Sequence, residues 1–285
     1  MIKIKLTQLL SVNKYAILHG WQGLPEYLPS DLDIIILPEE LHKLERNLLE
    51  AKDAYLVNLL QHESTCFYFV LAVRNGEKVS FLPIDVATDY RRDGRIWFSA
   101  EELLQGREKW KDFWIASSEV EFKYLLVKKI LKEGFPEHSA KRLKELAIEL
   151  GTKADAIAED LLGKKWAGQV MEWIRAGNRE ALEASSHTLK KVLKRRKFLK
   201  DPLNPFRYWF LEIKRIWRRW FYPTGLWVTV LGSDGAGKAR LSRILFKILK
   251  EHSDERLFFT LCQPYFAKNR ENLLLILTEN HLARG

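Results

Sequence analysis

The sequence predicts an α+β protein with a mixed sheet first, an all-helical appendage next and a partial α/β unit last. Three observations predict this order. Apolar residues alternate with a period of two in the first part, and from Ser117 the period changes to about 3.6. Near the end, the apolar run Leu226 to Leu231 leads into a glycine-rich loop and a helical pattern. The part with the mixed sheet is expected at 1–115 and the helical appendage at 116–200. A linker with a basic amphipathic helix is expected at 201–224, and the partial α/β unit at 225–285.

Strands are expected in the first part wherever a short apolar run is bounded by turn residues. Asn75-Gly76 is a strong hairpin signal between two of these runs. A turn is expected over Asp89 to Gly94. The expected strands are Tyr15 to Gly20, Asp31 to Leu37, Tyr55 to Leu60, Cys66 to Arg74, Lys78 to Ala87 and Arg95 to Ser99.

Helices are expected where capping residues precede a 3.6-residue period. Pro38 opens a helix that runs to about Lys52. Ser99 and Glu102 have the spacing of a capping box, and Ser117 has the same relation to a stripe that includes Tyr124. Further helices are expected at about Ser139 to Leu150, Lys153 to Leu162, Trp166 to Ala176 and Arg179 to Lys197.

Three aspartates are the candidate reactive groups. Asp31 and Asp33 are two residues apart at the start of an apolar strand, so their side chains point to the same face. Asp85 lies between Ile84 and Val86 in another expected strand. Carboxylates gathered on one face repel each other unless a cation lies between them, and hard oxygen ligands suit Mg²⁺. A pair plus a single aspartate is what two-metal phosphoryl or nucleotidyl transfer requires.

These residues resemble the nucleotidyltransferase fold of the polymerase beta type: Gly20, then eleven positions to Asp31, then Asp-Leu-Asp, and later Asp85 in an apolar strand. The resemblance implies that Asp31, Asp33 and Asp85 bind the metal ions. It also implies that Asp85 helps to deprotonate the acceptor hydroxyl and that the backbone at Gly20 approaches the triphosphate. Trp21 departs from the family, which has a small residue there. The alternative is that Asp31 has only a local role as a capping or turn residue, and that Asp33 is a solvated residue at the edge of the sheet.

A second phosphate-binding pattern follows the strand at Leu226 to Leu231. In the sequence Gly232-Ser233-Asp234-Gly235-Ala236-Gly237-Lys238, glycines allow backbone N–H groups to surround phosphates and Lys238 reaches their oxygens. The segment resembles thymidylate-kinase-like proteins of bacterial surface-polysaccharide gene neighbourhoods. That resemblance implies ATP or another NTP, bound by Gly232, Asp234, Gly235, Gly237 and Lys238. Ala239 replaces the Ser or Thr that binds Mg²⁺, so we expect a truncated or decayed kinase unit.

The positive charge is concentrated in one segment. His187 to Gly225 holds twelve Lys or Arg and two acids, an excess equal to the net charge of +10 of all 285 residues. Within it, Phe206 to Tyr222 carries an aromatic stripe with a basic flank. We expect this helix to pack its stripe on one of the domains; an anionic membrane surface is the second alternative, and nucleic acid the third.

The composition narrows the class of protein further. Cys66 and Cys262 form no CxxC or Cys/His cluster, which argues against zinc and disulfides. No apolar run is long enough to span a membrane, and no leader is visible, so we expect a cytoplasmic protein or one peripheral to the inner membrane face. The expected reaction is Mg²⁺-dependent transfer from an NTP to a small hydroxylated acceptor such as a sugar phosphate. The alternative is a catalytically inactive nucleotide-binding or assembly factor, which Trp21 and Ala239 favour.

Overall fold

The computed structural model divides the chain into two units, Met1–Arg215 and Ile216–Gly285. The described residues lie in the first unit, in the helix that continues from it, and at two positions beyond that helix. The glycine-rich segment at 232–238 and Ala239 lie outside the described residues. The structure describes residues 10, 14–24, 31–51, 54–75, 78–221, 240 and 244.

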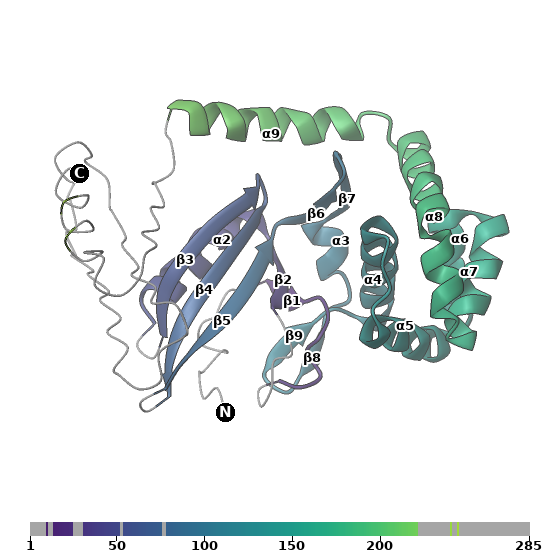
Figure 1. Ribbon diagram of the computed structural model, residues 1–285, viewed down its shortest axis with the longest axis horizontal. Coiled ribbons are helices and arrows are strands. Elements are labelled where there is room, and N and C mark those ends of the chain that lie inside the picture. Colours follow the sequence, from purple (N-terminus) through teal and green to yellow (C-terminus); the bar gives the residue numbers. More distant parts are fainter. Residues whose placement is uncertain are drawn as a thin grey trace. The chain divides into compact units, whose positions relative to one another are not determined.

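A mixed sheet of seven strands lies at the centre of the described part of the first unit, in the order β3-β4-β5-β2-β1-β9-β8 (Figure 1). β2 pairs with β5 in parallel, as does β1 with β9, and the remaining pairs are antiparallel. The predicted α+β class with a mixed sheet is confirmed. The strands are β1 (Tyr15–Ile17), β2 (Leu32–Ile36), β3 (Ala54–Glu63), β4 (Cys66–Asn75), β5 (Lys78–Ala87), β8 (Glu108–Trp110) and β9 (Phe113–Ile115).

The two faces of this sheet belong to different cores. One face packs against α2 (Leu41–Leu49), which follows the 3₁₀ turn η1 (Pro38–Glu40) and buries Leu44 and Leu48. Alternate residues of β2 and β5, such as Ile34 and Ile84, point to that side. The other face carries Ile35 and faces the helical part of the chain. The odd-numbered positions of β2 therefore point toward the helices.

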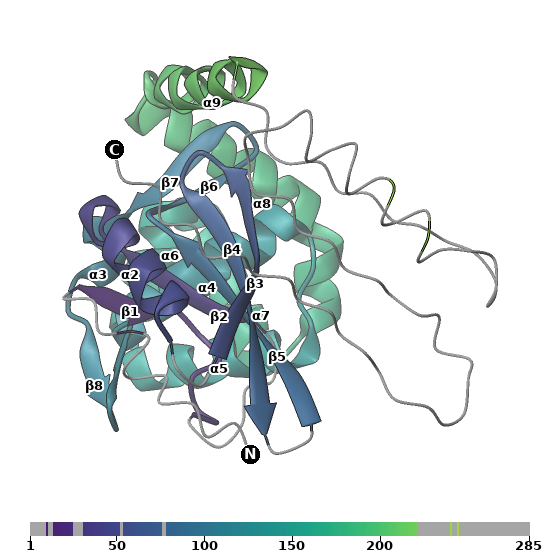
Figure 2. The same ribbon diagram turned by 90° about the vertical axis from the view of Figure 1, so that its left-hand side faces the viewer.

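Five helices between residues 118 and 200 gather beside the end of the sheet formed by β1, β9 and β8 (Figure 1), and the perpendicular view shows them behind the strands (Figure 2). Each was expected from its 3.6-residue period, and Ser117 caps the first by accepting from the Val120 N–H. The helices are α4 (Ser118–Lys132), α5 (Glu137–Leu150), α6 (Thr152–Leu162), α7 (Lys164–Ala176) and α8 (Arg179–Lys200).

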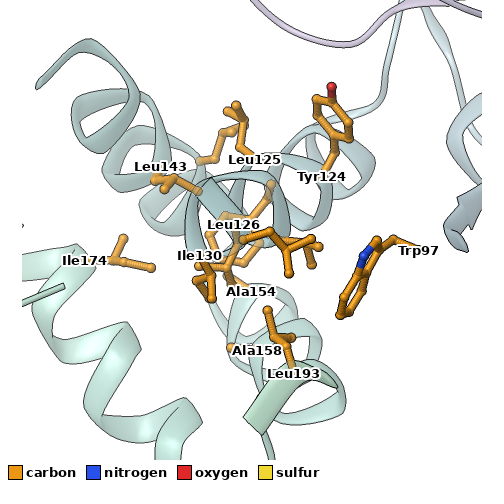
Figure 3. Packing of buried hydrophobic residues seen from close by; sticks show 14 of the residues in the cluster. Trp97, Tyr124, Leu125, Leu126, Ile130, Leu143, Ala154, Ala158, Ile174 and Leu193 are labelled. Atoms are coloured by element: carbon orange, nitrogen blue, oxygen red, sulfur yellow. The ribbon is translucent and has the colours of Figure 1, made fainter. Parts of the chain in front are cut away.

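α4 is the helix that joins the sheet to the other helices. Leu126 and Ile130 are buried among residues of α5, α6 and α7, such as Leu143 and Ile174 (Figure 3). The same cluster includes Ile35 of β2, so one continuous core fixes α4 against the sheet. This packing sets where the polar residues of α4 meet the strands.

Several elements differ from the sequence-based expectations. Asp89 to Gly94, expected as a turn, contains the strand β6 (Asp89–Arg92), which pairs with β7 (Arg95–Ser99). The short strands β8 and β9 were not expected. The predicted capping box of Ser99 and Glu102 is confirmed at α3 (Ala100–Leu104).

The basic amphipathic helix forms α9 (Asn204–Phe221). We expected its aromatic stripe to pack on one of the domains, but the stripe is exposed and does not pack on the described part of the first unit. Packing on the expected partial α/β unit at 225–285 lies outside the described residues. The buried side chains of α9 are Asn204 and Glu212. The helix is therefore held by its polar side.

Candidate functional site

Asp33 and Asp85 are direct neighbours across the parallel pair β2–β5. Asp33 is the register partner of Asp85, flanked by the partners Leu32 with Ile84 and Ile34 with Val86. Register partners in adjacent strands project to the same face of a sheet. The flanking apolar residues fill the opposite core, so both carboxylates are directed to the face that α4 approaches.

Asp33 is held by two basic side chains. His19 Nε2 lies 2.8 Å from Asp33 Oδ2, and Lys128 Nζ of α4 lies 3.1 Å from Asp33 Oδ1. The two basic groups also meet, with 2.9 Å between Lys128 Nζ and His19 Nε2. Burial alone would raise the pKa of the Asp33 carboxyl, but the hydrogen bond from His19 and the charge of Lys128 outweigh burial and hold that pKa well below its ordinary value.

The pKa of the Asp85 carboxyl is shifted in the opposite direction from that of Asp33. Burial raises the pKa of its carboxyl, and the negative charge of Asp33 raises it further. Cys66 of β4 donates from Sγ to Asp85 Oδ1 at 3.2 Å. Burial and the charge of Asp85 in turn raise the pKa of the Cys66 thiol, which keeps the thiol protonated as a donor. Neighbouring carboxylates whose pKa values are pushed apart are typical of acid–base sites.

Asp31 lies just outside β2 and is exposed. The charge of Asp31 nevertheless acts on Tyr68, which lies beside Asp85 in the sheet. After burial, the charges of Asp31 and Asp85 are the causes that raise the pKa of Tyr68, and Tyr68 is the register partner of Asp85 on β4. Asp31 therefore lies at the rim of the site, while Asp33 and Asp85 form its centre.

Gly20 adopts φ +74°, a left-handed conformation that favours glycine, and the space where a Cβ would be is open. Trp21 does not fill that space, because its ring is buried in the sheet's other core and packs against Trp110 at 4.8 Å between centroids. The guanidinium of Arg142 lies 5.5 Å from the centroid of the Trp21 ring. The departure from a small residue at position 21 thus has a packing role.

Aromatic and cationic groups surround the carboxylates on the α4 side. The ring of Tyr124 stacks with His19 at 5.9 Å between centroids. Lys129 and Lys132, also on α4, have lowered pKa values, first because of burial and then because of the charge on Lys128; that of Lys129 falls to about 8. The acidic pair therefore lies beside a cluster of positive charge, which suits an anionic ligand such as a phosphate chain.

The oxygen ligands at this site are of the type that Mg²⁺ prefers, and burial together with the charge of Asp33 raises the pKa of Asp85. Within the part of the chain that the structure describes, no three His, Cys, Asp or Glu side chains are grouped so as to hold one metal ion. Both oxygens of Asp33 already have basic partners. Asp33 and Asp85 fit a divalent ion on the condition that Lys128 withdraws from Asp33.

The structure brings Asp33 and Asp85 together, places Asp31 at their rim, and gives Gly20 the backbone conformation that only glycine readily adopts. The phosphate-binding segment at 232–238 lies outside the described residues. The sequence reasoning missed His19 and Lys128. His19 could have been noticed because it directly precedes Gly20. Lys128 carries a weaker signal, as it lies one helical turn after Tyr124.

No protein-family model and no curated protein matches the chain. Among solved structures, it is similar to a provisionally named nucleotidyltransferase from H. pylori, with 11% identity, coverage of 67% of this chain and 92% of that chain, and a TM-score of 0.32. It is also similar to JHP933 from Helicobacter pylori, with 12% identity, coverage of 70% and 93%, and a TM-score of 0.29. TM-scores of this size do not assign a function to the chain.

Proposed function

We propose that this chain is a Mg²⁺-dependent transferase that moves a nucleotidyl or phosphoryl group from ATP or another NTP to a small hydroxylated acceptor. The observation that carries the proposal is the register pairing of Asp33 with Asp85, beside the ammonium group of Lys128. Two adjacent carboxylates on one sheet face can both ionise only when positive charge compensates them. A bound divalent ion would supply that charge and would stabilise the negative charge that develops during transfer.

Each residue has a separate role in this proposal. Asp33, with its low pKa, stays ionised and binds the ion, and Asp31 is the candidate for a further ligand at the rim. Asp85 shares the ion and, because its pKa is raised, is suited to accept the proton of the acceptor hydroxyl. Lys128, once withdrawn from Asp33, would be free to pair with the donor's phosphates. The open space at Gly20 lets the triphosphate approach the backbone.

The glycine-rich segment is proposed to bind nucleotide without taking part in the transfer. We propose that the backbone at Gly232 to Gly237 and the side chain of Lys238 bind phosphates of a nucleotide, as the sequence pattern indicates. Because Ala239 has no hydroxyl for a metal ion, we assign transfer to the Asp33–Asp85 site and only binding to this segment. A sugar or sugar phosphate is the proposed acceptor class, and the cytoplasm, where NTPs are available, the proposed compartment.

A second candidate is a nucleotide-binding or assembly factor without chemistry. One observation favours it specifically: Lys128 and His19 already satisfy both oxygens of Asp33. If these contacts persist when nucleotide binds, no ion can reach Asp33. Nucleotide would then bind without metal, through the glycine-rich segment and Lys238.

Nucleotide turnover in the presence of a panel of sugars and sugar phosphates tests the two candidates. Asp85→Asn keeps the size of the side chain, so we expect an unchanged melting temperature and loss of Mg²⁺-dependent release of pyrophosphate or nucleoside diphosphate. Asp112→Asn, in the turn between β8 and β9, is the matched control and should retain turnover. Full activity of Asp85→Asn would remove the transferase proposal. Metal-independent nucleotide binding that is lost only in Lys238→Ala would support the second candidate.

A further inference from the structure

The apolar face of α9 is exposed along the whole helix. Among described residues, such a row of large apolar side chains on one helix is unusual for a protein surface, because contiguous exposed apolar patches of this kind mark interaction sites. The exposed fractions run from 49% at Ile216 to 81% at Trp220. The members of the stripe are Phe206, Trp209, Phe210, Ile213, Ile216, Trp217, Trp220 and Phe221.

Hydrogen bonds on the polar side of α9 hold the helix with its apolar stripe facing outward. Asn204 makes two hydrogen bonds with the backbone of Ile96: its Oδ1 accepts from the N–H at 2.9 Å and its Nδ2 donates to the carbonyl at 2.8 Å. Glu212 accepts from the Ser64 N–H at 2.8 Å and pairs with Arg215 at 2.7 Å. Both residues are 3% exposed. Turning the helix to bury its stripe would leave these buried polar groups without partners, which costs more than a typical exposed contact gains.

The charges on α9 indicate which kind of partner binds the aromatic stripe. The helix contains five Lys or Arg and one acid, Glu212, whose charge is compensated by Arg215. Lys214 and Arg218 lie one turn apart and are both exposed. A helix with a Trp and Phe stripe and exposed cations beside it suits the interface of an anionic bilayer, where the rings enter the headgroup region and the cations stay with the phosphates.

A second copy of the chain fits this face less well. Packing one stripe against another by two-fold symmetry would bring the rows of Lys214 and Arg218 of two helices toward each other, and like charges would oppose the contact. No helix of the described residues is long and apolar enough to cross a membrane. The geometry therefore favours a helix that lies in the plane of the lipid surface.

We propose that α9 docks the protein on an anionic lipid bilayer, with its aromatic stripe in the headgroup region and Asn204 and Glu212 holding the helix to the domain. This surface is independent of the proposed reaction. It would keep the sheet and the helices attached to the membrane through a rigid, polar-anchored helix.

Flotation of the full chain with vesicles tests the proposal. We expect the protein to float with phosphatidylcholine vesicles that contain phosphatidylglycerol, and to bind those of phosphatidylcholine alone much less. The double variant Phe210→Ala/Trp217→Ala should lower the partition coefficient at least about tenfold. The double variant Tyr55→Ala/Phe81→Ala removes two exposed aromatic rings from the sheet and is the matched control, which should float like the wild type. Lys214→Glu/Arg218→Glu should abolish the preference for phosphatidylglycerol.

Three results would overturn the proposal: no flotation of the wild type with the anionic vesicles, equal flotation of Phe210→Ala/Trp217→Ala, or an equal loss in the control. Analytical ultracentrifugation without lipid tests the alternative that a second copy of the chain binds the stripe. A wild-type dimer that becomes a monomer in Phe210→Ala/Trp217→Ala would assign the stripe to self-association and reject lipid docking. Circular dichroism identifies any variant that fails to fold. In that case the single variant Phe210→Ala replaces the double variant, with the same requirement for reduced flotation.

Discussion

Lys128 Nζ on α4 lies 3.1 Å from Asp33 Oδ1 on β2, so a buried ammonium group stands beside the carboxylate that the sequence assigns to a metal ion. The contact joins the helical part of the chain to the centre of the sheet. It supplies the positive charge that a pair of adjacent carboxylates needs, and it competes with any divalent ion for the same oxygen.

Replacing Lys128 by Met is expected to have two opposite effects. Asp33 loses a buried partner, so the free energy of unfolding without metal should fall by about 2 kcal/mol. The affinity for Mg²⁺ should rise, because the ion no longer competes with an ammonium group. Denaturant unfolding with and without Mg²⁺ measures both, since an ion that binds only the folded state stabilises it. A variant that is destabilised but gains nothing from Mg²⁺ would contradict the competition.

The conformation of Gly20 predicts a backbone effect without a steric clash. Gly20→Ala should lower the free energy of unfolding by on the order of 1 kcal/mol, because φ is +74° although the Cβ would meet open space. Gly168 in α7 is the control: a Cβ there also meets open space, but the backbone is helical, so Gly168→Ala should stabilise by about 0.5–1 kcal/mol. Urea unfolding compares the two, and effects of the same sign would refute the assignment.

Lys129 predicts a pH dependence with a defined sign. Burial, with the charges of Lys128 and Lys132, lowers the pKa of Lys129 from 10.5 to about 8. Between these values the unfolded state binds more protons than the folded state, so this group makes the protein more stable as pH rises. Lys129→Met removes the buried charge and should stabilise the protein at pH 7 by on the order of 1 kcal/mol. That gain should shrink as pH approaches 10.5 in urea unfolding; a constant gain would contradict the lowered pKa.

Much of the site could be predicted from local patterns, but its assembly could not. The short apolar runs around Asp33 and Asp85 predict two strands, and the alternation of side chains along a strand predicts the side to which each carboxylate points. The parallel pairing of those strands joins residues that are far apart in the sequence, and no local signal specifies it. Lys128 has the sequence context of an ordinary helical lysine, and only the packing of α4 on the sheet makes it a partner of Asp33.

Two other differences have physical causes of their own. β8 and β9 are three residues each, too short for an alternating pattern to be recognised. In α9 the amphipathic pattern correctly predicts a helix and its stripe, yet not the side that is buried. That side is decided by the hydrogen bonds of Asn204 and Glu212 with residues distant in the sequence. Amphipathicity alone therefore gives the two faces of a helix and not the partner of either.

The most direct test of the central claim is calorimetric titration of Mg²⁺, in the presence of a non-hydrolysable ATP analogue, into the wild type, Asp33→Asn, Asp85→Asn and the control Asp112→Asn. We predict saturable binding in the wild type and the control, and a loss of at least about tenfold in affinity in Asp33→Asn and in Asp85→Asn. Mg²⁺ affinity that is equal in all four proteins would show that the paired carboxylates on β2 and β5 do not form a metal site.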